Sequence, residues 1–242
     1  MTAESGFSRA PLQSTANSGP LFTEQEFSWD HTEGITGSGS FLVVFVGAID
    51  TASEQRVEAL EATFVGATTQ MMDLAHELTG DGNAFPSAHI FTLTEPTFTG
   101  TDPASFSGVV TVSMNEVVSN INAFSVVMTG VNTTSLGFLP GSFTDRVEHN
   151  LTSTGTLSGS ISAVPGDLLV DCVIANAGLS DDHTVGADQI LDVRLALNSG
   201  GSSKMSVSHK FASTAEHTRG MERSDLTALE TVSEVKFAIE MD

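Results

Sequence analysis

Aromatic side chains with a polar tip are almost missing from this sequence. It has no Tyr and a single Trp, Trp29, whereas Phe occurs 15 times in 242 residues. Carbohydrate platforms usually rely on exposed Trp and Tyr, because these rings combine a flat apolar face with a hydrogen-bonding group. Phe fills a core but donates no hydrogen bond. The composition therefore argues against a sugar-binding platform and against a receptor-binding tip.

Basic side chains are also scarce. Nine Lys and Arg stand against 30 Asp and Glu, which gives a formal net charge of -21 and a pI near 4.4. Since non-specific nucleic-acid affinity depends on Lys and Arg neutralising phosphates, we expect no DNA or RNA partner. The low Lys content also fits a saline environment. It leaves open a halophile enzyme, although no site for one can be named.

Disorder through charge is excluded by the same numbers. Charged residues make up only 16% of the chain and hydrophobic residues 40%, with a mean hydropathy of +0.09. A disordered chain combines low hydrophobicity with high charge. One large domain or two small ones are expected from this length.

Cysteine and long hydrophobic runs are lacking as well. The single cysteine, Cys172, cannot form an internal disulfide, and its setting LLVDCVIA predicts a buried strand in which it acts as a small hydrophobe. The longest apolar run, 41–49, falls short of the roughly 20 residues of a membrane-spanning helix. The N-terminus shows no basic region followed by an apolar one, so we expect synthesis in the cytoplasm, no classical export and no membrane partner.

Residues 1–26 are polar and rich in Ser, Thr, Gly and Pro, without hydrophobic periodicity. This composition predicts an extended N-terminal arm and not a folded element. Such a polar terminus is ordered when something ties it down, and a neighbouring subunit is one candidate. Residues 27–242 contain no linker and no repeat at a fixed period, so we expect one domain there.

From Phe27 onward, short segments rich in Val, Phe, Ile and Thr alternate with Gly, Pro, Asn and Asp. This pattern predicts an all-β protein, an antiparallel, jelly-roll-like β-sandwich. Segments 41–49 and 168–174 are apolar on both faces and should lie in the middle of a sheet. In 232–241, Val235 and Ile239 alternate with Lys236 and Ala238, which predicts one face toward the core and one toward solvent. The expected strands are 41–49, 57–65, 88–95, 108–114, 122–130, 150–161, 167–175, 189–197, 203–212 and 232–241.

Two stretches have local helix propensity. Segment 53–62 has a plausible N-cap and good helix formers, and segment 69–78 places Met72, Ala75 and Leu78 at helical spacing. The surrounding pattern favours strands, so helix and strand stay open for both stretches. Neither outcome changes the fold class.

Three segments in order support a family resemblance: SFLVVFVGAI, NAFSVVMTGVNTTSLG and AVPGDLLVDCVIANAG. They resemble a jelly-roll-like β-sandwich module found in bacteriophage structural proteins and bacterial surface proteins, most specifically in 130–136 and 165–171. Ser135 stands where the module usually has Pro, and Phe237 stands where a Trp is usual. The resemblance implies a sandwich with virion or surface associations and brings no catalytic residues.

No catalytic, cofactor-binding or metal-binding site is predicted. The acidic pairs Glu58/Glu61, Glu230/Glu234 and Asp188/Asp192 lack the i, i+2 spacing that puts two carboxylates on one face of a strand.

Single candidates are also weak. Asp171 lies in an apolar strand; a solvated position is favoured for it over a buried one with a shifted pKa. The seven His residues show no zinc spacing, and the oxygen-rich segments 81–83 and 181–183 are better explained as turns than as calcium loops.

The function predicted from these features is a non-enzymatic virion structural protein of a bacteriophage. An outer capsid decoration or cement protein is favoured, stabilising the shell through subunit contacts and the N-terminal arm. Its partners would be the major capsid protein or other virion proteins and further copies of the chain, a trimer being one option. The alternatives are a tail or head-fibre component, or a secreted or cell-surface adhesion or glycan-binding module.

Overall fold

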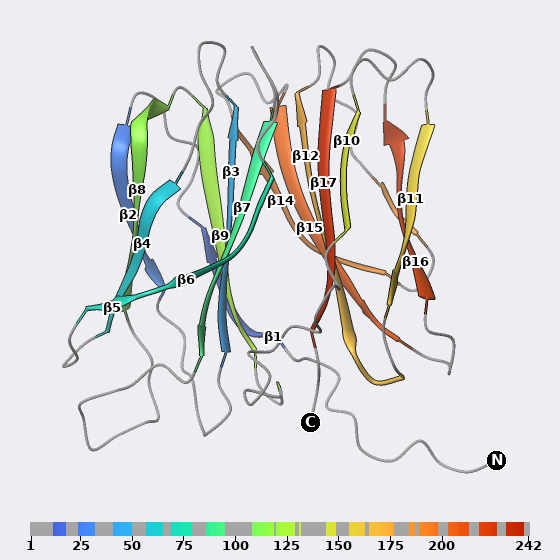
Figure 1. The fold of residues 1–242 in the computed structure, drawn as a ribbon, viewed down its shortest axis with the longest axis horizontal. Helices are drawn as coiled ribbons and strands as arrows, with labels where there is room; N and C mark the ends of the chain where they lie inside the picture. The colour runs from blue at the N-terminus through green and yellow to red at the C-terminus, as the bar shows by residue number, and fades with distance from the viewer. Residues whose placement is uncertain are drawn as a thin grey trace.

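The fold is known from a computed structural model, in which all regular structure of the described residues is antiparallel β-strand (Figure 1). The predicted class, an all-β antiparallel sandwich, is confirmed. No helix of the length and apolarity needed to cross a bilayer occurs in the part of the chain that the structure describes. That part comprises residues 12–17, 24–31, 41–49, 57–64, 69–78, 86–94, 108–118, 120–128, 131, 144–148, 155–162, 165–176, 184–186, 189–197, 203–212, 218–226 and 231–239.

Four sheets lie side by side as successive layers (Figure 1). The first outer sheet has the order β2-β8-β4-β5, with strands Glu24–His31, Gly108–Val118, Val57–Phe64 and Gln70–Met71. The first inner sheet has the order β1-β9-β3-β7-β6, with strands Leu12–Asn17, Ile121–Met128, Phe41–Ile49, Pro86–Thr94 and Asp73–Leu78. The second inner sheet has the order β10-β17-β12-β15-β14, with strands Thr144–Glu148, Thr231–Ile239, Leu168–Asn176, Ser203–Phe211 and Ile190–Ala196. The second outer sheet has the order β11-β16-β13, with strands Gly155–Ser162, Thr218–Leu226 and Thr184–Val185.

The two halves of the chain have the same topology. Replacing β1-β9-β3-β7-β6 by β10-β17-β12-β15-β14, strand for strand, converts the first inner sheet into the second. The same replacement converts β2-β8-β4 into β11-β16-β13. The order of the first half, β1-β9-β3-β7 facing β2-β8-β4-β5, is that of a jelly roll. The molecule is thus built from two jelly-roll sandwiches in tandem.

The correspondence extends to the pairing register. Val43 of β3 pairs with Thr92 and Val126, and its counterpart Val170 of β12 pairs with His209 and Phe237. The edge strands β6 and β14 pair with Thr92 and His209 through Asp73 and Ile190. In both, a β-bulge follows the next pair, after Leu74 in β6 and after Leu191 in β14. A bulge conserved in position between the two halves indicates one shared architecture and not two unrelated sandwiches.

The first core lies inside the first sandwich, between β2-β8-β4-β5 and one face of β1-β9-β3-β7-β6. Its aromatic centre is Phe27 stacked on Trp29, with ring centroids 5.8 Å apart. The residues that fill it alternate along each strand, as expected for one face of a pleated sheet. They are Phe27, Trp29, Leu42, Val44, Val46, Ala48, Met72, Phe91, Val110, Val112, Met114, Ile121, Ala123 and Val127.

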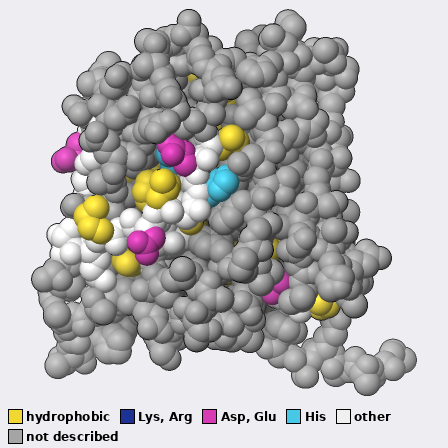
Figure 2. All heavy atoms as spheres, in the orientation of Figure 1, with side chains coloured by type: hydrophobic (Ala, Val, Ile, Leu, Met, Phe, Trp, Pro, Cys, Tyr) yellow, Lys and Arg dark blue, Asp and Glu magenta, His cyan; other side chains and the backbone are white. Residues whose placement is uncertain are grey.

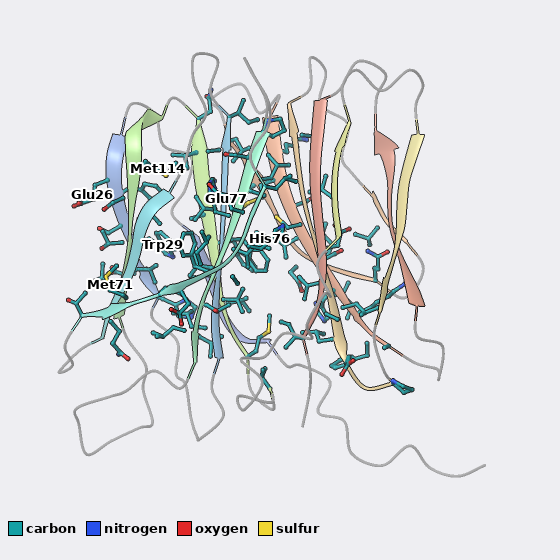
Figure 3. All side chains as sticks on the ribbon, viewed as in Figure 1. Glu26, Trp29, Met71, His76, Glu77 and Met114 are labelled. Atoms are coloured by element: carbon teal, nitrogen blue, oxygen red, sulfur yellow. The ribbon has the colours of Figure 1, made fainter. Side chains whose placement is uncertain are left out.

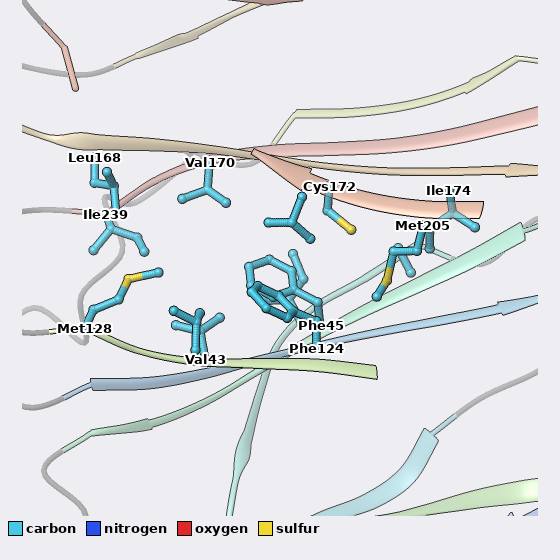
Figure 4. Close-up of a cluster of buried hydrophobic side chains, with 14 of the residues drawn as sticks. Val43, Phe45, Phe124, Met128, Leu168, Val170, Cys172, Ile174, Met205 and Ile239 are labelled. Carbon is cyan, nitrogen blue, oxygen red and sulfur yellow. The ribbon is translucent and has the colours of Figure 1, made fainter. Parts of the chain in front are cut away.

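A second core joins the two sandwiches, because the inner sheets bury their remaining faces against each other (Figure 4). Phe45 and Phe124 stack at its centre, with centroids 6.1 Å apart, and Cys172 lies across from them. At Gly47 the side chains of the facing sheet lie close to the backbone. A Cβ atom there would lie 2.8 Å from Met205 Sδ and 3.1 Å from Ile174 Cδ1.

The strands β3 and β12 are central in their sheets and buried on both faces, as the sequence predicts. Segments 53–62 and 69–78 form no helix in their described residues: 57–64 is β4, and 70–71 and 73–78 are β5 and β6. Sheet pairing outweighs local helix propensity here. The other expected strands are found with shifts of a few residues at their ends, apart from the start of 150–161, which lies outside the described residues.

The N-terminal segment differs from the expectation of an arm without folded elements. Residues 12–17 form β1, which pairs with β9 of the same chain, and β2 already begins at Glu24. Both strands belong to the first sandwich. The single sandwich expected for 27–242 is accordingly two sandwiches of equal strand order, the first of which recruits strands from 1–26.

The last strand also departs from its predicted half-burial. Ile239 faces the second core as expected, but Ala238, predicted to face solvent, is fully buried too. The reason is the layer beyond it, since the outer sheet β11-β16-β13 covers the other face of the second inner sheet (Figure 1). Just before β12, Pro165 and Gly166 form a turn in which Gly166 adopts φ 101°, a conformation that favours glycine.

Candidate interaction surface

The most organised polar cluster of the described residues lies inside the first core. Trp29 Nε1 donates a hydrogen bond of 2.9 Å to Ser125 Oγ, and His31 Nδ1 lies 2.8 Å from the same oxygen. The Ser125 hydroxyl accepts from the indole, and the imidazole tautomer decides which of Ser125 Oγ and His31 Nδ1 donates in the second contact. Burial lowers the pKa of His31 from 6.5 to about 4.

A Ser and a His within hydrogen-bond reach are the start of a nucleophile and base pair. His31 and Ser125 are both fully buried, however, so no substrate reaches them. The lowered pKa also makes His31 a weak base near neutral pH. The cluster is structural: it gives a buried indole N–H the partner that it needs.

This position of Trp29 removes the one sugar-stacking candidate of the sequence. The side chain points between the sheets and not outward, and the residue is 7% exposed (Figure 3). A glycan cannot stack on a ring that is packed against Phe27. Trp29 therefore provides no platform for the adhesion alternative.

Two further His residues contact carboxylates at sheet edges. His209 Nδ1 lies 2.7 Å and 2.9 Å from the two carboxylate oxygens of Asp192, and both side chains are 6% exposed. His89 Nε2 lies 3.2 Å from Glu77 Oε1. Each contact joins an edge strand, β14 or β6, to its neighbour, β15 or β7. Sequence reasoning missed both, because a β-bulge and cross-strand register decide which residues meet.

Asp171 and Cys172 are adjacent on β12, and both side chains are buried. Cys172 is 1% exposed in the second core, which confirms the prediction. Asp171 is fully buried, so the solvated position favoured for it was wrong. Its face of the sheet would be solvated in a two-layer sandwich, but in this molecule the outer sheet covers it.

The other acidic candidates are not brought together in the described residues. No group of three or more His, Cys, Asp or Glu side chains that could hold a metal ion occurs in the part of the chain that the structure describes. The segments 81–83 and 181–183, the residues Asp188 and Glu230, and the side chains of Glu58, Glu61 and Glu234 lie outside the described residues.

The outward face of the first outer sheet is a polar, acidic surface. Along β2, Glu26, Ser28 and Asp30 are exposed, whereas the residues between them are buried. Glu26 points away from the molecule (Figure 3) and accepts a hydrogen bond from Ser113 of β8. On the face drawn in Figure 2, the described side chains at the surface include acidic, His and hydrophobic groups but no Lys or Arg.

Exposed apolar side chains of the described residues lie on edge strands and on an outward face. Leu74 of β6 and Ile190 of β14 are 48% and 55% exposed on the two equivalent inner-sheet edges. Met71 of β5 and Val109 of β8 are exposed on the first outer sheet. Sheet edges are places where proteins add a strand from a partner.

Comparison with known proteins gives little guidance. No family model matches the chain, and no curated protein matches it. Among solved structures, one similar chain is described as the crystal structure of PBSX exported protein XepA, with 11% identity, 95% coverage of this chain, 85% of that chain and a TM-score of 0.22. Another is described as Red Clover Necrotic Mosaic Virus, with 10% identity, 94% and 96% coverage and a TM-score of 0.24. At such scores these likenesses carry no argument about fold or function.

Proposed function

We propose that the protein is a non-enzymatic structural protein of a virion, and more specifically an outer decoration or cement protein of a bacteriophage capsid. The observation that carries this proposal is the duplicated jelly roll, in which two sandwiches of equal strand order share one core. Jelly rolls recur in viral capsid and lectin domains, so the step from fold to role is an analogy at the level of the fold. The sequence resemblance to phage structural modules points the same way.

The rigidity of the stack suits a shell component. Two-sided burial of both inner sheets ties the sandwiches together through side chains such as Phe45, Phe124 and Ile174, all at most 2% exposed. Each fully buried side chain of this size contributes about 1.5 to 3 kcal/mol. The two sandwiches are therefore held together by one shared core.

The charge distribution supports the outside of a particle over its interior. Glu26, Asp30 and Asp73 are exposed, and the whole chain carries a charge of -21. Packaged DNA would repel such a surface, whereas solvent and a complementary capsid patch would not. The partners proposed are the major capsid protein or other virion proteins, together with further copies of this chain.

The proposal is tested by fractionating virions of the virus that encodes the chain. Mass spectrometry should detect the protein in intact particles and, after heads and tails are separated, in the head fraction. Particles that lack it should break at a lower temperature and should regain stability when purified protein is added. Detection in tails alone supports the tail or head-fibre alternative, and absence from particles overturns the proposal.

A matched pair of variants examines the acidic face. Replacing Glu26 and Asp30 by Lys reverses two charges on the outward face of β2, while Asp73→Lys changes a charge on β6. If the outward face of β2 contacts the capsid, the first variant alone should lose binding to particles that lack the protein. Equal binding by both variants places the contact elsewhere on the molecule.

A further inference from the structure

Strands β1 and β10 hold equivalent places in the two sandwiches, but their positions along the chain differ. Each is the edge strand beside the last strand of its half: β1 pairs with β9 and β10 pairs with β17. The register matches as well, since Ala16 pairs with Ser125 and the equivalent Thr144 pairs with Lys236. β10 has described strands before and after it, whereas β1 is the first strand that the structure describes.

Within its sheet, β1 is held through one neighbour. It pairs with β9 alone, and a bulge between Leu12 and Ser14 interrupts that pairing. Its sequence, LQSTAN, contains only Leu12 and Ala16 as apolar residues. The pairing is therefore mainly a backbone ladder, which does not depend on which copy of the chain supplies the strand.

The partner strand β9 has the opposite character. All eight of its residues, Ile121–Met128, are buried, and β3 covers its other edge. Buried backbone N–H and C=O groups must be paired, so β9 needs a strand on the side where β1 lies. The place must be filled, and the segment that fills it is the first described strand, which β2 follows in the sequence.

We propose that β1 is an exchangeable strand, and that in the assembled state β1 of one copy pairs with β9 of a second copy. Residues 18–23 separate β1 from β2 in the sequence. Exchange preserves every backbone pair between β1 and β9. The free energy of exchange therefore depends mainly on the effective concentrations of the chain's own β1 and of the β1 of a second copy. In dilute solution, β1 of the same chain pairs with β9. When copies are held side by side, β1 of a neighbouring copy competes for this pairing.

This inference deepens the proposed function, because it names a second copy of the chain as the partner of the N-terminal segment. It does not depend on the virion role, since exchange can be measured on the purified protein. Failure of the fractionation experiment would leave exchange intact, and failure of exchange would leave the protein in the particle. The two outcomes are therefore distinguishable.

The test uses two single-cysteine chains of different mass, both carrying Cys172→Ala. One chain has Ala16→Cys and the other has Ser125→Cys, so a disulfide between these positions forms only between chains. The chains are unfolded together, refolded at high concentration, oxidised mildly and separated on a non-reducing gel. Exchange predicts a heterodimer band that increases with concentration and is suppressed by an excess of chain that carries Cys172→Ala alone, because its β1 competes for the same place.

The control uses the equivalent positions of the second sandwich, Thr144→Cys in one chain and Lys236→Cys in the other. Because β10 has strands before and after it, this pair should yield at most a trace of heterodimer. A double variant with Ala16→Cys and Ser125→Cys in one chain confirms that the register permits the disulfide. The proposal is overturned if the double variant cross-links within one chain while the mixture yields no more heterodimer than the control.

Ser125→Cys alters the hydroxyl that binds Trp29 and His31, so a second pair guards against misfolding. Ser14→Cys in one chain and Val127→Cys in the other are also paired in register. Circular dichroism of each chain shows whether it folds before mixing. The two pairs should give the same result.

Discussion

At the scale of single residues, the first core depends on one hydroxyl. Ser125 Oγ accepts from Trp29 Nε1 and lies 2.8 Å from His31 Nδ1, and the three residues come from strands of facing sheets, β2 and β9. A buried indole or imidazole without a partner costs about 1 to 3 kcal/mol. The alternating sequence of β2 predicts which residues are buried, but the partner, 94 to 96 positions away, is supplied by the packing of the sheets.

His31 makes stability depend on pH. Its pKa is about 4 in the folded chain against 6.5 as the ordinary value. Between these values the unfolded state binds a proton that the folded state excludes, so stability is full above about pH 6.5 and falls as the pH drops toward 4. The loss amounts to about 3 kcal/mol.

The check is urea unfolding of the wild type and of His31→Asn across this pH range. Asn offers Ser125 an acceptor oxygen but does not titrate there. The difference in unfolding free energy between the two proteins should shrink as the pH falls from 6.5 to 4. A constant difference would show that His31 is protonated in the fold or contributes no linkage.

Cys172 should be inert in the folded protein. It is 1% exposed in the core between the sandwiches, so a chromogenic thiol reagent reaches it only when the molecule opens. We expect no reaction under native conditions and one equivalent of reaction in denaturant. Rapid labelling of the native protein would mean that the two sandwiches separate easily.

At the scale of elements, the inner-sheet edges follow one plan in both halves. β6 and β14 each carry a bulge at the same register position, and each is joined to its neighbour by a His and a carboxylate. Bulges make an edge a poor template for further strand addition. The β6 and β14 edges are thus poor places for the addition of a further strand.

The contact of Asp192 with His209 should contribute measurably to the stability of the second sandwich. His209→Ala leaves a carboxylate that is 6% exposed without its imidazole partner, at a cost of about 1 to 3 kcal/mol. Removing both side chains should cost less than the sum of the single changes. Thermal unfolding of the two single variants and the double variant measures this coupling.

Ile190→Ala provides the control on the same strand. Its side chain is 55% exposed, so the change should stay within about 0.5 kcal/mol. If His209→Ala were equally mild, the contact would contribute little and the edge would be held by its backbone ladder alone.

The strands themselves could be predicted where one face or both are apolar. β3 and β12 were predicted within one residue at each end, because fully buried strands have continuous apolar sequences. β1, β2, β10, β13 and β16 were not among the expected strands. Their sequences are polar or short, and sheet pairing determines their conformation.

At the scale of the whole molecule, the duplication joins two sandwiches through their inner sheets, and Gly47 lies at the joint. Its counterpart in the second half is Ile174, one of the two residues that fill the space above it. Any Cβ at position 47 must displace Met205 or Ile174, both fully buried. At this equivalent position the first half has no side chain and the second half has a large one, which fills the space between the sheets.

Gly47→Ala should destabilise the molecule by about 1 to 3 kcal/mol through overpacking. Combining it with Met205→Val should recover part of the loss, because the nearest atom, Met205 Sδ, is then removed. Denaturant unfolding of the two single variants and the double variant gives the coupling. If the changes in unfolding free energy of the two single variants simply added in the double variant, Met205 would not be the side chain that opposes a Cβ at position 47.

The duplication also left a trace in the sequence. Aligned by register, β3 and β12 share identical residues at four positions, Leu42/Leu169, Val43/Val170, Val46/Val173 and Ala48/Ala175. The sequences of this pair are FLVVFVGAI and LLVDCVIAN. The other strand pairs of the inner sheets show no comparable identity: INAFSVVM of β9, for example, does not resemble VSEVKFAI of β17. One related strand pair is too little to reveal a repeat without the pairing register.

The sequence by itself determined the all-β class, the two central strands, the buried cysteine and the acidic, Lys-poor composition, because each follows from local pattern or from counting. The tertiary structure alone decided that four sheets stack, that Asp171 and Ala238 are buried and that Trp29 lies in a core. It also decided that β1 joins the sheet of its own half. These features depend on which faces cover each other, and strand alternation specifies two faces without specifying what lies against either of them.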